Sequence, residues 1–398
     1  MSDVVEGARS DPALPPAIDV TVSRRSELTR CSRWAKALGT ERKDHRYYEL
    51  VEDTVVGGYD HRYFIVGGSD DELTAVQPFF ILDQDMLAGT PPRIQRAVEA
   101  VRRLLPGFLT MRTLMVGCVA GEGHLDGDDD RSQGRNADLL AAAIIGHARE
   151  LKVHLIVLKE FPAKYRTALN AFLRAGFTRV PSLPMVRLNI DYPSFEDYVN
   201  RGLSAKTRKD LRKKFRAAER AGPITLTVVE DVTPYIDVAH PLYLQVFERS
   251  ALHFEKLSKQ FFCELGRLMP DKVKFFLWHQ DTKLVAFSLC MIHDDSIYAE
   301  YLGLEYPLAL DLHLYHYAFR DVVSWAMTNG YKWFCSSGLN YDPKLHLGCR
   351  LDPLDLYVRH TSGAVNLVLK RILPLIEPTR NDPILKKFPN YSDLWASS

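Results

Sequence analysis

No stretch of the sequence approaches about 18 uninterrupted apolar residues, the length that a helix needs to cross a bilayer, so no membrane span is expected. Residues 1–20 are acidic and rich in proline, and they lack the basic-then-apolar order of a secretory signal. We therefore predict a flexible leader over 1–20 and a cytoplasmic protein.

Cysteine is scarce, and its spacing matches neither a disulfide framework nor a zinc site. The sequence has no C-x-x-C pair, and most cysteines sit in apolar runs, so we expect buried thiols in a reducing compartment and no metal. The six are Cys31, Cys118, Cys263, Cys290, Cys335 and Cys349. Net charge is also nearly absent: 51 Lys+Arg against 50 Asp+Glu give +1, which argues against a general polyanion binder but permits a local basic patch.

The composition indicates a globular chain with more than one domain. The chain is 46% hydrophobic and 11% aromatic, a composition that excludes disorder for most of it. Its length of 398 residues is greater than one small hydrophobic core can accommodate. The expected elements also repeat, because each half reads hairpin, strand, helix, strand. We predict an α/β fold with mixed, partly antiparallel sheets, divided into an N-terminal domain (21–200), a basic linker helix (201–222) and a C-terminal domain (223–398).

The pattern of each half gives specific elements. In the first half we expect strands Arg62–Val66 and Ala75–Ile81 joined by a turn at 67–71, strand Leu114–Cys118, helix Ala137–Leu151, strand Val153–Leu158, a helix over 163–175 ended by Gly176, and strand Met185–Ile190, which closes the half. In the second half we expect strands Thr225–Val229, Lys274–His279, Leu284–Ile292 and Ser296–Leu304, a long helix Leu310–Thr328, strand Tyr331–Ser336, and one more strand and helix within Leu356–Ile376.

A strand that runs into a helix N-terminus presents unpaired N–H groups, which makes it a natural seat for a pyrophosphate. The unit from Ser296 to Ser336 has this layout, and Leu302, Gly303 and Asp311 are its candidate ligand contacts. Glu300 is a carboxylate in an otherwise apolar strand, which favours either a general base or an edge residue facing water. An ordinary αβ unit without a ligand is the alternative.

The loop after the last strand of this unit is typical of a segment that wraps a ligand. Ser336, Ser337 and Gly338 are small, and Lys344 could neutralise a phosphate or an oxyanion. His346 is either a proton relay or a cap of the loop. The earlier Asp-rich loop, 117–135, lacks the spacing of a calcium loop, and we predict a mobile surface segment there that could act as a lid.

The linker helix is strongly basic, with eight Lys and Arg residues against Asp210 and Glu219 between 206 and 220. Ser204 is its expected N-cap, and Gly222-Pro223 ends it. We expect either a solvated linker or an anion site for CoA phosphates, a nucleotide-linked acceptor or tRNA, with Arg208 and Arg212 as candidates.

Two segments carry a resemblance to a known family. Leu203–Arg212 reads L-S-A-K-T-R-K-D-L-R, and it resembles the segment that precedes the second half of tandem GNAT-fold proteins. Pro343–Gly348 shares a Lys and a Gly with the F-K-x-x-F-G-type motif of Fem peptidyl transferases. The chain thus resembles the BioF2-like (Acetyltransf_6) branch of the GNAT superfamily, which is related to the Fem enzymes.

The resemblance implies two GNAT-like domains with catalysis mainly in the second. It implies an N-acyltransferase that passes an acyl group from a thioester, expected to be acyl-CoA, to the amine of a small-molecule acceptor, with no tightly bound cofactor. Glu300, Lys344 and His346 would be catalytic. The GNAT signature Q/R-x-x-G-x-G/A is absent from both halves. An aminoacyl-tRNA-dependent transferase and a non-catalytic binding protein therefore stay open.

Overall fold

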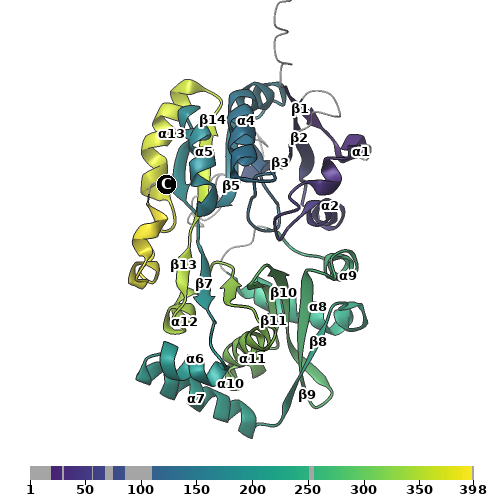
Figure 1. The fold of residues 1–398 in the computed structure, drawn as a ribbon, viewed down its shortest axis with the longest axis vertical. Coiled ribbons are helices and arrows are strands. Elements are labelled where there is room, and N and C mark those ends of the chain that lie inside the picture. Colours follow the sequence, from purple (N-terminus) through teal and green to yellow (C-terminus); the bar gives the residue numbers. More distant parts are fainter. Residues whose placement is uncertain are drawn as a thin grey trace, which may run out of the picture.

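A computed structural model describes residues 19–28, 31–55, 57–67, 75–85, 110–250 and 255–396. Within them the chain forms two mixed sheets, one above the other in Figure 1, and the predicted fold class is confirmed. The predicted leader and the turn at 67–71 lie almost wholly outside the described residues. None of the described helices is long and apolar enough to cross a bilayer.

Each sheet contains seven of the described strands. In spatial order the first sheet holds β1 (Val20–Ser23), β2 (Asp60–Val66), β3 (Ala75–Asp85), β4 (Thr110–Val116), β5 (Leu155–Pro162), β14 (Leu354–His360) and β6 (Thr178–Pro181). The second holds β8 (Ile224–Val229), β9 (Val273–Gln280), β10 (Lys283–His293), β11 (Ser296–Leu304), β12 (Trp333–Ser336), β7 (Met185–Asn189) and β13 (Arg350–Asp352).

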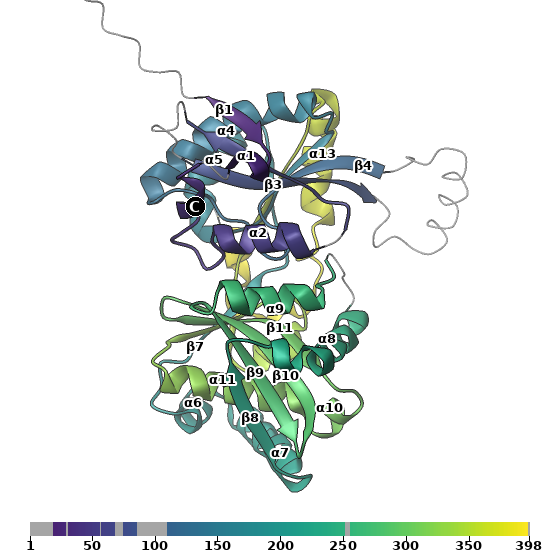
Figure 2. The ribbon, with the colours of Figure 1, turned by 90° about the vertical axis from the view of Figure 1, so that its right-hand side faces the viewer.

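The helices lie around these sheets (Figures 1 and 2). The first half contributes α1 (Arg25–Leu28), α2 (His45–Thr54), α4 (Asp130–Glu150), α5 (Arg166–Arg174) and α6 (Phe195–Gly202). The rest are α7 (Ala205–Arg220), α8 (Ile236–Arg249), α9 (Lys259–Leu268), α10 (Leu308–Asp311), α11 (Leu314–Thr328), α12 (Tyr341–His346) and α13 (Gly363–Ile376).

The two sheets have the same order, and their sixth strands are exchanged. In both sheets a parallel pair, β4–β5 or β11–β12, is followed by an antiparallel strand and then a short edge strand. The sixth strand of the first sheet is β14, from the end of the chain, and that of the second sheet is β7, from the first half.

The exchange corrects one prediction. Met185–Ile190 was expected to close the first half, but β7 pairs with β12 and β13 in the second sheet. The last strand, β14, lies in the first sheet in its place. The boundary expected between residues 200 and 223 therefore does not separate the two sheets. An alternating apolar pattern predicts a strand with one buried face, but it does not indicate which sheet the strand joins.

The predicted basic helix is present as α7. The Ser204 side chain accepts from the Thr207 N–H as N-cap, and Gly222 follows the helix with φ +132. The long helix predicted over 310–328 is broken instead into α10 and α11, because His313 adopts a left-handed conformation with φ +50.

The first part of the expected mobile loop at 117–135, residues 117–127, is instead packed into the protein. Gly117–Gly127 is buried apart from Gly121, and Asp126 is 2% exposed. Its carboxylate accepts from the backbone N–H groups of Leu38 (2.9 Å) and Val76 (2.8 Å) and pairs with Arg33. The segment is no lid, because a carboxylate satisfied by buried backbone donors ties the loop to the core. The last acidic residues serve α4, whose first turn is capped by Asp129.

We expect Asp126→Ala to destabilise the protein by about 3 kcal/mol, since it strands two buried N–H donors and a partly buried guanidinium. The matched control is Asp128→Ala, because Asp128 pairs with the same Arg33 but its side chain is 79% exposed. The control should change stability by no more than about 0.5 kcal/mol. Urea denaturation followed by circular dichroism measures both; equal losses would contradict a structural role specific to Asp126.

Candidate active site

β11 and β12 pair only over their first residues and then diverge. The parallel register runs from Ser296–Trp333 to Ala299–Ser336, where β12 ends while β11 continues to Leu304. A wedge between these strands therefore opens in the described structure, and it begins beside Glu300.

A β-bulge lies at the same point. On β10, Leu289 faces Tyr301 and the adjacent Cys290 faces Ala299, so Glu300 is the extra residue of β11. A bulge re-aims side chains. It directs Glu300 and Tyr301 to the same side of the sheet, where Glu300 meets Arg42 and the Tyr301 hydroxyl donates to Glu255 (3.0 Å).

Glu300 is held by two cations from the first half of the chain. Its carboxylate pairs with Arg42 and lies 3.5 Å from the Lys43 ammonium. Glu122, from the packed loop, pairs with Arg42 and accepts from Lys43 (2.7 Å). These side chains are at most 9% exposed. Arg42, Lys43, Glu122 and Glu300 form what we call the buried charge network.

Each carboxylate of the network faces both cations. Burial lowers the pKa of the Lys43 ammonium. Burial alone would raise the pKa of Glu122, but Arg42 and Lys43 outweigh it and hold that pKa well below its usual range. The Arg42 guanidinium also lies over the Tyr298 ring, 4.0 Å from its centre.

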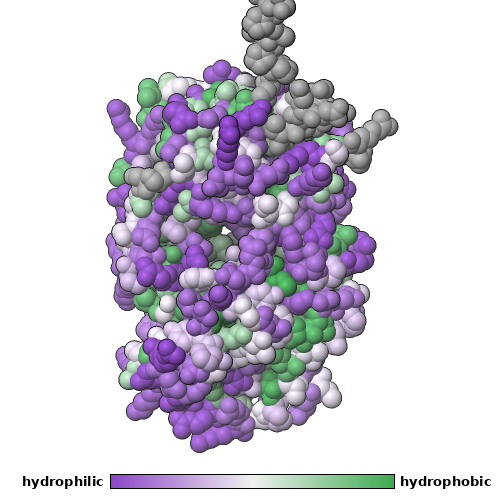
Figure 3. Space-filling model, viewed as in Figure 1, coloured by the Kyte–Doolittle hydropathy of each residue, from purple (hydrophilic) through white to green (hydrophobic). Residues whose placement is uncertain are grey.

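A second polar group borders the network. The His124 ring lies 3.3 Å from both Glu122 and Glu41. Glu41 accepts from the Tyr165 hydroxyl (2.6 Å) and from Lys164 (2.8 Å). Figure 3 shows a hollow at mid-height between the two halves, with mostly hydrophilic residues around it. Polar groups are thus concentrated where the halves meet.

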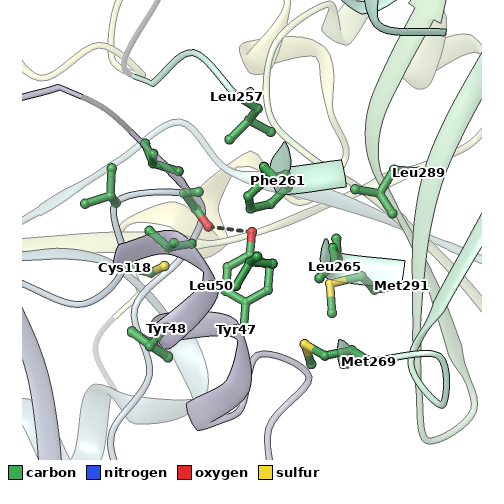
Figure 4. Close-up of a cluster of buried hydrophobic side chains, with 14 of the residues drawn as sticks. Tyr47, Tyr48, Leu50, Cys118, Leu257, Phe261, Leu265, Met269, Leu289 and Met291 are labelled. Carbon is green, nitrogen blue, oxygen red and sulfur yellow. Dashed lines mark hydrogen bonds between the residues drawn. The ribbon is translucent and has the colours of Figure 1, made fainter. Parts of the chain in front are cut away.

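An apolar contact supports this region. Tyr47 and Leu50 of α2 pack against Phe261 and Leu265 of α9 (Figure 4). The Tyr47 hydroxyl donates to the Ala120 carbonyl of the packed loop (3.0 Å). The segment that carries Arg42 and Lys43 directly precedes α2, so this core fixes both cations.

The equivalent wedge of the first sheet is filled by the protein itself. β4 and β5 pair over Thr113–Val116 and then diverge. The Gly123 N–H donates to the Glu160 carbonyl (3.2 Å), and the Lys159 ammonium donates to the Gly121 carbonyl (2.8 Å). A Cβ on Gly123 would lie 2.7 Å from the Lys159 carbonyl oxygen, so only glycine fits at this position. We call the loop 117–127, which fills this wedge, the plug.

Lys344 is a structural anchor of the loop after β12. Its ammonium donates to the carbonyls of Ser337 (2.6 Å) and Leu339 (2.9 Å), and burial lowers its pKa to about 8. Ser336 ends β12 at the mouth of the wedge, while the backbone of Gly338 packs against Tyr341. The loop is thus rigidly held beside the wedge.

His346 does not belong to this group. Its side chain is 61% exposed, and its ring contacts the Asp342 carbonyl of its own short helix (2.8 Å). Of the two readings of this residue, the structure shows the local contact. Asp311, at the end of α10, is exposed as well.

Arg208 and Arg212 are occupied by protein contacts. Arg208 donates to the carbonyls of Asn200 (2.6 Å) and Leu203 (3.0 Å), and Arg212 pairs with Glu196 and donates to the Asn200 side chain (2.9 Å). In this structure they hold the end of α6. Other cations of α7 are exposed, namely Lys206, Lys209, Lys213, Arg216 and Arg220.

The residues expected to bind a pyrophosphate after β11 make contacts within the protein instead. Gly303 faces α8, since a Cβ would lie 2.7 Å from the Tyr243 nitrogen, and Leu302 packs into the core on the other side. The N–H groups of Ala309, Leu310 and Leu312 all donate to carbonyls of their own segment. They are therefore not presented to a phosphate. Among the described residues no His, Cys, Asp or Glu cluster could hold a metal ion.

Sequence reasoning found Glu300 but missed its partners. Glu41, Arg42, Lys43 and Asp44 are four consecutive charged residues, each at most 5% exposed. A charge run normally marks a solvated surface, so nothing in the pattern distinguished this one.

The FemAB_like family model, described as peptidoglycan biosynthesis/recognition, matches residues 124–350, more than half of the chain. The protein belongs to the FemAB_like family. No curated protein sequence matches it.

Three solved structures are similar to this FemAB_like chain. L-PGS from Bacillus licheniformis is 13% identical with a TM-score of 0.51, covering 83% of this chain and 95% of that one. FemX is 12% identical with a TM-score of 0.50, covering 83% and 93%. A tandem GNAT protein from the clavulanic acid biosynthesis pathway is 12% identical with a TM-score of 0.41, covering 80% and 88%.

We expect the buried Lys344 to make stability depend on pH. Its pKa falls from 10.5 to about 8 on folding, so between these values the unfolded chain holds a proton that the folded protein has released. Stability therefore rises with pH in this window, by up to about 3 kcal/mol from this group. Urea denaturation of wild type and Lys344→Met at pH 8 and pH 10 measures the effect. From pH 8 to pH 10 the unfolding free energy of wild type should rise relative to that of the variant. His346→Gln should show the same rise in unfolding free energy as wild type. If the difference in unfolding free energy between wild type and Lys344→Met is the same at both pH values, the assignment to Lys344 is contradicted.

Proposed function

We propose that the protein transfers an acyl or aminoacyl group to an amine where β11 and β12 diverge. The observation that carries the proposal is the bulge that places Glu300 at the divergence point, beside two buried cations. Membership of the FemAB_like family supports it, and its description suggests the amine of a peptidoglycan precursor as the small-molecule acceptor.

The transfer is direct in this proposal. The acceptor nitrogen attacks the donor carbonyl, a C–N bond forms, and the C–O or C–S bond to the carrier breaks. Glu300 takes the proton of the amine and, as the carrier departs, returns that proton to the leaving oxygen or sulfur. A covalent enzyme intermediate is disfavoured at Cys335, because burial raises the pKa of its thiol to about 12. Ser336 and Ser337 would orient the donor at the mouth of the wedge.

The acyl or aminoacyl group arrives on a carrier, either CoA or tRNA, that the protein must bind. Acyl-CoA is the donor expected from the sequence, but the N–H groups of Ala309, Leu310 and Leu312 after β11 donate to carbonyls of their own segment, which disfavours a pyrophosphate bound there. The exposed cations of α7 favour a longer polyanion, and Lys214 of α7 lies 3.2 Å from His316 in the first turn of α11. We therefore place aminoacyl-tRNA ahead of acyl-CoA as the donor.

The donor proposal predicts salt-sensitive binding of tRNA. In filter binding, affinity for charged tRNA should fall by at least about tenfold between about 50 and 200 mM salt, because phosphate contacts release counterions. Lys209→Glu/Lys213→Glu on α7 should weaken binding, whereas Arg174→Glu on α5, also an exposed cation, should not. If acetyl-CoA raises the melting temperature of the protein and tRNA does not bind, acyl-CoA is the donor and the tRNA proposal is wrong.

The base assignment predicts a large loss in Glu300→Gln. With whichever donor binds and a peptidoglycan precursor peptide as acceptor, kcat should fall by at least about a hundredfold, and the acidic limb of the pH–rate profile should disappear. Glu305→Gln is the control, because Glu305 follows β11 and pairs with Lys283 at the surface. Unchanged turnover in folded Glu300→Gln protein would remove Glu300 from the reaction.

A further inference from the structure

The surface of α13 is unusually apolar. Nine large hydrophobic residues of the described chain are exposed, and six of them lie in this one helix. They are Val365, Leu367, Val368, Ile372, Leu375 and Ile376, between 42% and 67% exposed. Scattered exposed hydrophobic residues are ordinary, but a continuous patch of this kind marks an interaction site.

The helix presents two different sides. Its inner side is anchored: the Asn366 side chain accepts from the His360 N–H (3.1 Å) and donates to the Gly176 carbonyl (3.0 Å), and Leu369 and Leu373 pack against the core. The outer side carries Val365 and Ile372 at helical spacing, with Leu375 and Ile376 one turn further. α13 lies along the outer edge of the upper half in Figure 1, so the apolar side faces away from the protein.

The charge around this side has one sign. Between Asp355 and Glu377 the sequence contains Arg359, Lys370 and Arg371 and no acidic residue. Lys370 and Arg371 are exposed on α13 itself. An apolar stripe flanked by cations complements the boundary between the acyl chains and the headgroups of an anionic bilayer.

We propose that α13 docks the protein onto an anionic membrane surface, lying flat in the headgroup region. The helix has 14 residues, or about 21 Å, too short to span a hydrocarbon core of about 30 Å. A second copy of the chain is the other occupant to consider. Leu367 is 65% exposed and lies outside the stripe, so the apolar surface is wider than a two-helix seam.

The test is sedimentation of the full-length protein with vesicles. Wild type should pellet with vesicles of phosphatidylglycerol and phosphatidylcholine in equal parts, and less with phosphatidylcholine alone. Ile372→Glu/Leu375→Glu should weaken binding by at least about tenfold. Val238→Glu, an equally exposed apolar position on α8, should bind as wild type does. Lys370→Gln/Arg371→Gln should reduce binding to the anionic vesicles only.

Circular dichroism and the melting temperature confirm that each variant is folded. Light scattering should show wild type as a monomer at the same concentration. The proposal is overturned if wild type does not pellet, if folded Ile372→Glu/Leu375→Glu binds vesicles as wild type does, or if wild type is a dimer that this variant makes monomeric. The last result would assign the surface to a second copy of the chain.

Discussion

The exchange of β7 and β14 is the constraint on which the rest of the structure depends. Each sheet has as its sixth strand a segment that belongs in sequence to the other half. Neither sheet is complete without the other, so the two halves are fixed as one unit. This permits charges from both halves to meet in a buried network, where a misplaced partner would be costly. It also pre-organises the electrostatics around Glu300, because the cations need not move into place.

Local signals predicted the elements of this fold well. The strand Ser296–Leu304 and the cap at Ser204 follow from apolar alternation and capping chemistry, which act within a few residues. α4 begins at Asp130, well before the predicted start at Ala137, because its polar first turn lies in an Asp-rich run that is typical of a loop. Strand exchange is invisible at this level, since the pattern of β7 is satisfied by any sheet that covers one of its faces.

The site was only partly predictable, for a related reason. Glu300 stood out because a carboxylate in an apolar strand demands a partner, and that argument needs no knowledge of the partner. Arg42 and Lys43 come from more than 250 positions away and belong to a run of charges that normally faces water. Lys344 and Arg208 were chosen for their charge, yet their hydrogen bonds go to nearby carbonyls. Sequence indicates which groups are costly to bury, and the fold decides what satisfies them.

The duplication has become asymmetric in a way that links the two wedges. In the first sheet the wedge is closed by the loop from Gly117 to Gly127, held by the Gly123 N–H. The filled wedge leaves no space for a ligand, but the same loop carries Glu122 to the two cations that face Glu300. The plug of one wedge is thus part of the wall of the other.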